Sequence, residues 1–165
     1  MTVLQTILVV VITLLLLFGL VLLVMLAALG RSEQNRQPPK LGAQGGNLSP
    51  CPQTPNCIST QAPMEAGVNR AEPIILQQEP EEAFRKITEW IEKEPRADLA
   101  ERDDARYLRA EFRSRIFGFV DDLEVVVTQD EEKNVLHVRS AARVGRGDMG
   151  VNRKRYDTLR AVLGD

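Results

Sequence analysis

Residues 107–128 read YLRAEFRSRIFGFVDDLEVVVT, and apolar and charged side chains alternate along most of this stretch. In 107–116 the even positions are mainly apolar and the odd positions mainly charged, which predicts a strand with one buried and one charged face. In 117–128 the same period places Leu123, Val125 and Val127 on the inner side. We therefore predict two antiparallel strands, 107–116 and 117–128.

The flanking segments extend the same sheet. Residues 130–134 are polar and typical of a turn, and 135–140 form a return strand with Leu136 and Val138 facing inward. A weaker strand is predicted at 97–103, and the short apolar run at 73–76 is predicted to be an edge strand.

Two amphipathic helices complete this region. The first starts at Glu79 and Pro80 and stops before Pro95, and its apolar residues recur at helical spacing: Ala83, Phe84, Ile87, Trp90 and Ile91. The second covers 148–163, with Gly164 as its stop. The order β-α-β-β-β-β-α predicts an α+β fold, an antiparallel sheet of about four to five strands with two helices on one face.

The N-terminal segment from Ile7 to Leu29 holds 21 apolar residues in 23. As a helix it is about 35 Å long, enough to cross a ~30 Å hydrocarbon core. All 44 charged residues lie from Arg31 onward, which excludes a wholly soluble protein and a polytopic one. We predict a single-pass anchor that contacts the lipid bilayer. A cleaved signal peptide is the alternative, but no Lys or Arg precedes the run, and the run exceeds the usual apolar core of a signal peptide.

The chain divides into three predicted parts: a transmembrane anchor at 1–30, a flexible tether at 31–49 and a soluble α+β domain at 50–165. The tether is rich in Gln, Gly and Pro and too polar to form a core. Because 21 Lys and Arg face 23 Asp and Glu, a strongly basic nucleic-acid binder is excluded.

Cys51 and Cys57 enclose five residues, two of them proline. A structural disulfide is the favoured interpretation, and free thiols or a redox or metal pair are the alternatives. With His137 the only histidine, no metal site is predicted. A disulfide indicates an oxidising compartment, whereas the positive charges of Arg31, Arg36 and Lys40 after the anchor favour a cytoplasmic domain.

A set of charged residues is predicted to share the outer face of the sheet: Arg109, Glu111, Arg113, Asp122, Glu124, His137 and Arg139. One interpretation is a solvated face whose cross-strand ion pairs each contribute under ~1 kcal/mol. The other is an enzyme in which Asp121, Asp122 and Glu124 act as acid/base groups or metal ligands and His137 carries protons. No recognised catalytic motif is present, so we predict neither catalytic residues nor a cofactor.

A glycine-rich stretch precedes the last helix. Arg143 and the glycines at 145, 147 and 150 lead into a first helical turn with Asn152 and Arg153. Such a stretch can hold an anion at a helix N-terminus. The alternative is a structural turn capped by Asp148.

Three blocks, LSPCPQTPNCIS at 48–59, 107–124 and VRSAARVGRGDMGVNRKR at 138–155, together resemble the family called domain of unknown function 1499. The chain departs from the family pattern at Arg109, where His is frequent, and at Ala142, Arg146 and Gly147, where Ser, Tyr and Ser are usual. The resemblance implies no established activity. Many relatives look like exported lipoproteins or membrane-anchored envelope proteins, which implies a disulfide and an extracytoplasmic domain.

Two hypotheses follow. The first is a membrane-tethered binding or structural module of the cell envelope, with an envelope protein or an anionic ligand as partner. The second is an envelope enzyme that uses the carboxylates and His137. They differ in one observable: the carboxylates either converge in a concave pocket or pair with Arg113 and Arg139 on the sheet.

Overall fold

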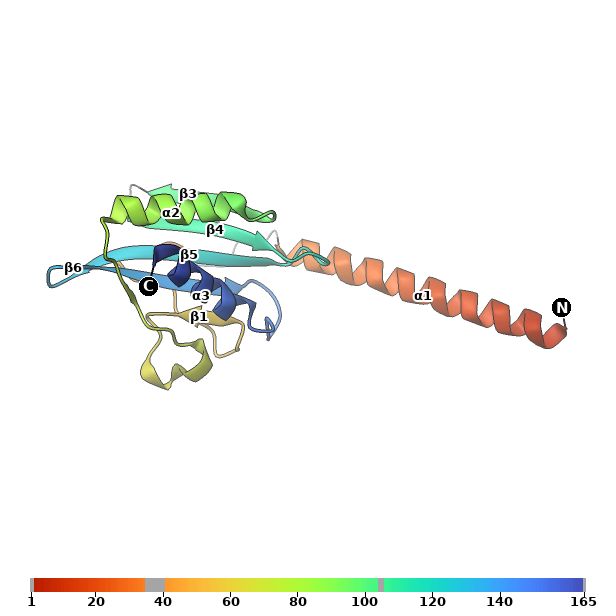
Figure 1. The fold of residues 1–165 in the computed structure, drawn as a ribbon. Helices are drawn as coiled ribbons and strands as arrows, with labels where there is room; N and C mark the ends of the chain where they lie inside the picture. The colour runs from red at the N-terminus through yellow and green to blue at the C-terminus, as the bar shows by residue number, and fades with distance from the viewer. Residues whose placement is uncertain (1, 35–40, 104–105, 165) are drawn as a thin grey trace.

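The computed structural model describes residues 2–34, 41–103 and 106–164. A long helix, α1, projects from a compact sheet domain (Figure 1). In chain order the elements are α1 (Val3–Gln34), β1 (Cys57–Ser59), the 3-10 helix η1 (Met64–Asn69), β2 (Ile74–Ile75), α2 (Pro80–Lys93), β3 (Ala97–Asp103), β4 (Tyr107–Arg113), β5 (Val120–Asp130), β6 (Lys133–Ala142) and α3 (Val151–Leu163).

The sheet has six strands in the order β1-β6-β5-β4-β3, and β2 also pairs with β6. Every strand pairing is antiparallel. The predicted α+β class is confirmed, and the strand count is slightly higher than predicted. The additional strand, β1, is three residues long, too short to show a period in the sequence.

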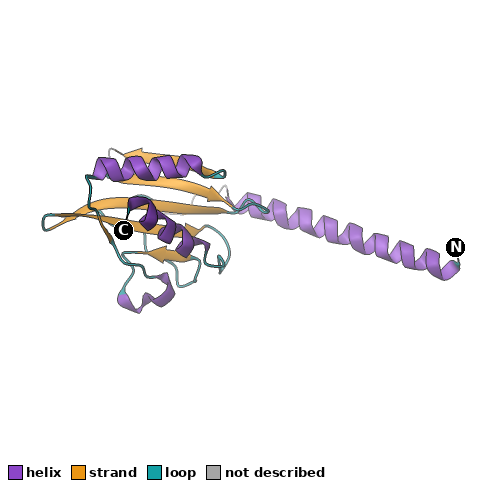
Figure 2. Cartoon of the chain, viewed as in Figure 1, coloured by secondary structure: helices purple, strands orange, loops and turns teal. Residues whose placement is uncertain are grey.

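Helices α2 and α3 cover one face of the sheet (Figure 2), as predicted. The buried side chains of α2 and α3 form one core with the inward residues of β4, β5 and β6: Phe84, Ile87, Ile91, Tyr156, Leu159, Leu108, Leu123, Val125, Leu136 and Val138. This apolar burial is the main stabilising contribution to such a domain. The period of two in the strands and the helical spacing in α2 both predicted it.

The turn between β4 and β5 is longer than predicted. The strands were expected to meet at 116–117, but β4 ends at Arg113 and β5 begins at Val120. Ser114 closes the turn, since its hydroxyl accepts a hydrogen bond from the Phe119 amide at 2.9 Å. Gly118 has a φ of 66°, which favours glycine and interrupts the extended backbone.

In the described part of the chain, one helix is long and apolar enough to cross a membrane, over Val3–Leu29. None of the described apolar side chains in this stretch is buried, and nearly all are exposed. At ~1.5 Å per residue this stretch is about 40 Å long, sufficient for a ~30 Å hydrocarbon core.

Part of the predicted tether is packed against the domain. Helix α1 extends to Gln34, and residues 35–40 lie outside the described residues. Leu48 is buried against Tyr107 and Val126, on the sheet face opposite the helices. The division of the chain at residues 30 and 49 stays a prediction, but residues 41–48 form a strap over this second face.

Candidate functional site

The charged residues at the centre of the second sheet face are buried, whereas Glu111, Arg113 and His137 are half-buried. Glu124 and Asp122 are 0% and 1% exposed, and Arg109 and Arg139 are both 8% exposed. The predicted solvated face is therefore wrong. The strap 41–48 covers part of this face and approaches it closely: a Cβ on Gly46 would lie 2.8 Å from a methyl carbon of Thr128.

Glu124 lies at the centre of one half of the buried charges. Its carboxylate accepts hydrogen bonds from the Tyr107 hydroxyl, the Arg139 guanidinium and the Gly42 amide of the strap, each at 2.9 Å. Burial and the negative charge of Glu124 raise the pKa of Tyr107. The phenol therefore remains a protonated donor at physiological pH.

Asp122 and Glu111 organise the other half. Arg143 binds Asp122 through Nε and Nη2, both at 2.7 Å, and its Nη2 also donates to Glu111 at 2.6 Å. Arg109 donates to Glu111 at 3.1 Å and to Asp122 at 3.4 Å. Burial raises the pKa of Glu111, but hydrogen bonds from Arg143 and Arg109 outweigh it and the pKa is lowered overall. The hydrogen bond to Asp122 raises the pKa of Arg143 against the opposing effect of burial.

The two halves together hold three arginines and three carboxylates, so the formal charges of these six groups balance: Arg109, Arg139, Arg143, Glu111, Asp122 and Glu124. Arg113, at the edge, pairs with Glu111 at 3.0 Å and with Asp98. Most of these residues lie on one face of the sheet, as the period of two predicts. The role of Arg143 was not predicted, because this residue lies beyond the end of β6, outside the alternating pattern.

Asp121 does not join this cluster. It points to the helix-covered face, where its carboxylate accepts a hydrogen bond from Arg155 at 3.0 Å. Burial raises the pKa of Asp121, and the charge of Arg155 partly opposes this shift. The proposed convergence of Asp121 with Asp122 and Glu124 is therefore absent, because neighbouring residues on a strand face opposite sides.

His137 lies on the charged face but apart from the carboxylates. Its ring nitrogens lie 3.4 Å from the Thr60 hydroxyl and 3.1 Å from the Thr128 hydroxyl. Burial lowers the pKa of His137. Within the described residues, no three His, Cys, Asp or Glu side chains are grouped so as to hold a metal ion.

The loop before α3 is a capped turn. Asp148 accepts hydrogen bonds from the amides of Gly150 at 3.0 Å and Asn152 at 2.9 Å, so its carboxylate occupies the N-terminus of α3. The Asn152 side chain is buried and bonds the Ser140 hydroxyl at 2.6 Å. Arg153 donates to two backbone carbonyls near η1. The geometry thus supports the structural turn rather than an anion site.

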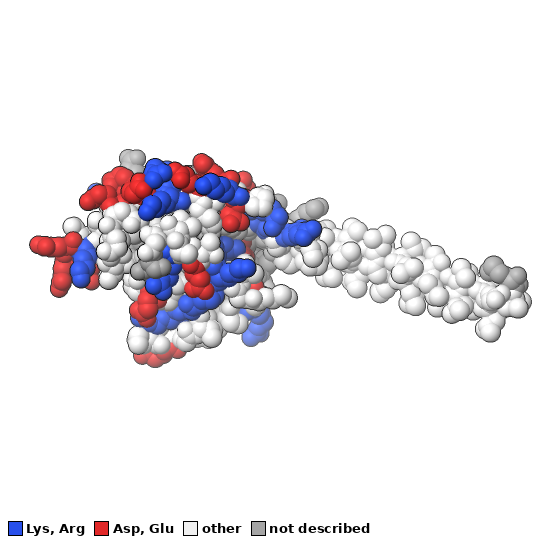
Figure 3. Space-filling model, in the orientation of Figure 1, with Lys and Arg blue, Asp and Glu red and all other residues white. Residues whose placement is uncertain are grey.

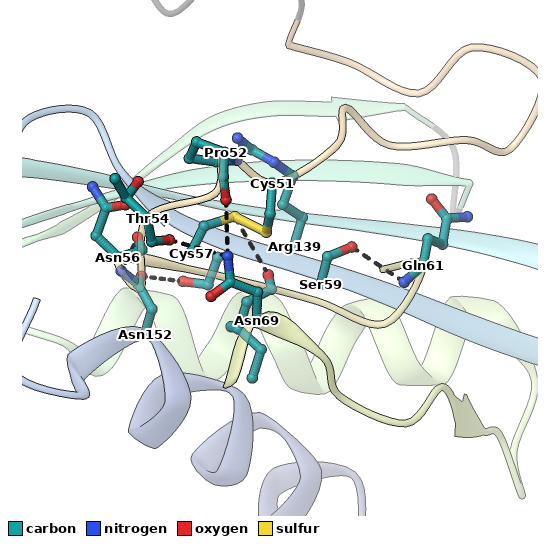
Figure 4. The surroundings of a disulfide bond; sticks show 12 residues. Cys51, Pro52, Thr54, Asn56, Cys57, Ser59, Gln61, Asn69, Arg139 and Asn152 are labelled. Atoms are coloured by element: carbon teal, nitrogen blue, oxygen red, sulfur yellow. Dashed lines mark hydrogen bonds between the residues drawn. A yellow bond between two sulfur atoms is a disulfide. The ribbon is translucent and has the colours of Figure 1, made fainter. Parts of the chain in front are cut away.

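Cys51 and Cys57 form a disulfide, the favoured interpretation of their spacing. Figure 4 shows the bond beside the side chain of Asn69, at the end of η1. The side-chain Nδ2 of Asn69 donates to the backbone carbonyls of Pro52 at 2.8 Å and Thr54 at 3.0 Å. The disulfide loop is therefore fixed both to β1 and to η1.

A cleft of about 640 Å³ lies between residues 47–55 and 59–69. Gln61 ties its two walls together, since its amide accepts from the Leu48 backbone and donates to the Gly46 carbonyl, both at 2.8 Å. The lining combines prolines with side-chain amides: Pro50, Pro52, Pro55, Pro63, Asn47, Gln53, Gln61 and Asn69. Of the described residues that line it, Glu65 alone is charged. This cleft was not predicted from the sequence, in which the proline-rich loop is its one visible sign.

The family model described as protein of unknown function (DUF1499) matches residues 47–163. The chain belongs to the DUF1499 family. The resemblance inferred from three sequence blocks is thereby confirmed. The DUF1499 match includes the disulfide, the cleft, all six strands and both packed helices, and α1 lies before it. No curated protein matches the chain.

Proposed function

We propose that the chain is a single-pass, membrane-anchored binding module of the cell envelope, and that its DUF1499 domain holds a ligand in the cleft between residues 47–55 and 59–69. The cleft is the observation that carries this proposal. Its volume of about 640 Å³ lies within the range of ligand pockets, which is roughly 300–1,000 Å³. The disulfide and the Asn69 hydrogen bonds hold one wall rigid, which reduces the entropy lost on binding.

The buried charges favour binding over catalysis. Asp122 and Glu124 each pair with an arginine, so both carboxylates already have a cationic partner within the domain. Their carboxylates do not line the cleft. Removing one partner would leave an uncompensated buried charge, which is strongly unfavourable. These groups therefore stabilise the domain that presents the cleft.

The lining favours an uncharged ligand with both amide and apolar groups. Asn47 and Gln53 offer hydrogen bonds, and the prolines offer apolar contact. An extended peptide segment of an envelope protein meets both requirements, because its backbone carries donors and acceptors at each residue. An anionic ligand fits less well, since Glu65 would repel it.

We place the domain outside the cytoplasm. The Cys51–Cys57 disulfide supports this placement, because disulfides persist in oxidising compartments. The disulfide loop also forms one wall of the cleft. The bilayer-spanning role belongs to α1, whose apolar side chains are exposed along the helix.

Site-specific photocrosslinking tests the cleft. A photoreactive phenylalanine replaces Val68 in the cleft lining, or the exposed Ile75 outside it, in the full chain in its native membrane. We expect a light-dependent adduct from position 68 alone, and its loss when Ala66→Trp fills the cleft. Equal adducts at positions 68 and 75, or an adduct unaffected by Ala66→Trp, would overturn the proposal.

A further inference from the structure

Two loops lie together at one end of the sheet. The turn 114–119 joins β4 to β5, and the loop 143–150 follows β6. Asp121 pairs with Ala142 in the β5–β6 ladder, so both loops leave the sheet at the same end. Figure 1 shows that this end faces α1.

This end presents apolar and basic side chains to the exterior. Ile116 is 78% exposed and Met149 is fully exposed. Arg115 and Arg146, one in each loop, are exposed as well. An exposed apolar side chain beside a basic one is typical of a surface that binds the lipid interface, where the first enters the acyl boundary and the second meets headgroups.

The turn at the opposite end of the β5–β6 hairpin has a different character. The turn between β5 and β6 carries Asp130, Glu131 and Glu132, all exposed. Figure 3 shows acidic side chains at this far tip. The two ends of the β5–β6 hairpin thus differ: Arg115 and Arg146 lie near Ile116 and Met149 at the end toward α1, and the turn at the other end carries three acidic residues.

The backbone holds Met149 outward. Its φ is 54°, a left-handed conformation that is unfavourable for a non-glycine residue. The two hydrogen bonds from the amides of Gly150 and Asn152 to Asp148 hold the loop in this shape. The helix cap alone does not require an apolar side chain there, and strained positions of this kind concentrate at functional sites.

We propose that this end of the domain docks on the lipid headgroups of the bilayer that holds α1. The inference rests on the proposed anchoring by α1 and goes beyond the proposed ligand site. Six residues, 35–40, separate the end of α1 from Leu41, so the chain between them reaches at most ~25 Å. The bilayer surface is therefore always within reach of the domain. Arg115 and Arg146 favour anionic headgroups.

Tryptophan quenching in liposomes tests the docking. The full chain with Trp90→Phe receives one new tryptophan by Ile116→Trp, by Glu132→Trp at the acidic end, or by Leu16→Trp within α1. The vesicles contain phosphatidylglycerol and brominated phosphatidylcholine. We expect blue-shifted, strongly quenched emission from the Ile116→Trp and Leu16→Trp chains, and little quenching from the Glu132→Trp chain.

The variants separate docking from anchoring. Quenching in the Leu16→Trp chain together with unquenched emission from Ile116→Trp would overturn the docking while the anchor stands. Arg115→Glu with Arg146→Glu should reduce quenching of the Ile116→Trp chain, and unchanged quenching would overturn the role of the headgroup charge. An intact Cys51–Cys57 disulfide and unchanged near-ultraviolet circular dichroism control for folding.

Discussion

The Glu124 carboxylate accepts a hydrogen bond from the Arg139 guanidinium at 2.9 Å across the β5–β6 ladder, where Glu124 is fully buried and Arg139 almost so. The Arg139 Nε is also buried and has no hydrogen-bond partner among the described residues. The buried positive charge of Arg139 is therefore neutralised mainly by Glu124. This makes the pair the most sensitive point of the charged face.

Glu124→Ala should lower the free energy of unfolding by about 3–5 kcal/mol, because it leaves Arg139 charged and buried without its partner. Chemical denaturation of the full chain in detergent measures the effect. Glu132→Ala, at an exposed turn, is the matched control and should change the free energy by no more than ~0.5 kcal/mol. A loss below ~1 kcal/mol for Glu124→Ala would show that the face is solvated.

His137 should make the domain less stable in mild acid. Its pKa is lowered in the folded state by burial, so below pH ~6.5 the unfolded chain binds more protons than the folded one. The free energy of unfolding then falls as the pH drops from about 6.5 to the folded pKa. Denaturation at a series of pH values should show a smaller loss for His137→Gln than for the parent chain. Parallel losses in the two proteins would contradict this origin.

Asp148→Ala should destabilise the domain by about 1 kcal/mol, because the first turn of α3 loses the acceptor for two backbone amides. Asp148→Asn, which keeps a side-chain acceptor, should cost less. Asp157→Ala removes a carboxylate from the exposed side of α3 and serves as the control. Thermal or denaturant unfolding of the three variants ranks them, and equal losses for Asp148→Ala and Asp157→Ala would refute the cap.

Removal of the disulfide by Cys51→Ser with Cys57→Ser should lower the free energy of unfolding by about 2 kcal/mol, since the closed loop is short. The same variant should weaken the photocrosslink from position 68, because the disulfide loop forms a wall of the cleft. Denaturation and crosslinking are measured on the same preparation. An unchanged crosslink would separate the disulfide from ligand binding.

The full chain should remain in the membrane fraction after high salt and alkali, because an apolar helix is not held there by charge. A processed soluble form that begins near Arg31 would instead indicate a cleaved signal peptide.

Maleimide labelling of intact cells tests on which side of the membrane the domain lies. We expect labelling of Cys51 and Cys57 only after treatment with a reductant. Thiols that label only after lysis, without reductant, would place the domain in the cytoplasm.

Local periodicity was sufficient to predict much of the fold. The alternation in β4 separated Leu108 from Arg109, and the helical spacing of Phe84, Ile87 and Ile91 predicted the buried side of α2. The same alternation should have separated Asp121 from Asp122, and grouping them by adjacency in the sequence was an error. Such patterns are readable because each records the geometry of its own element.

Burial of the charged face was decided only by tertiary structure. The strap residue Gly42 bonds Glu124 across 82 positions of sequence, and Arg143 reaches Asp122 from beyond the end of a strand. The cleft likewise arises between two irregular segments, 47–55 and 59–69, that have no period of their own. The sequence by itself determined the apolar N-terminal helix, the strand faces and the two packed helices, because these follow from local spacing. Contacts between distant segments decide what covers a face of the sheet, and therefore whether its charges are solvated or paired. Local spacing does not encode such contacts.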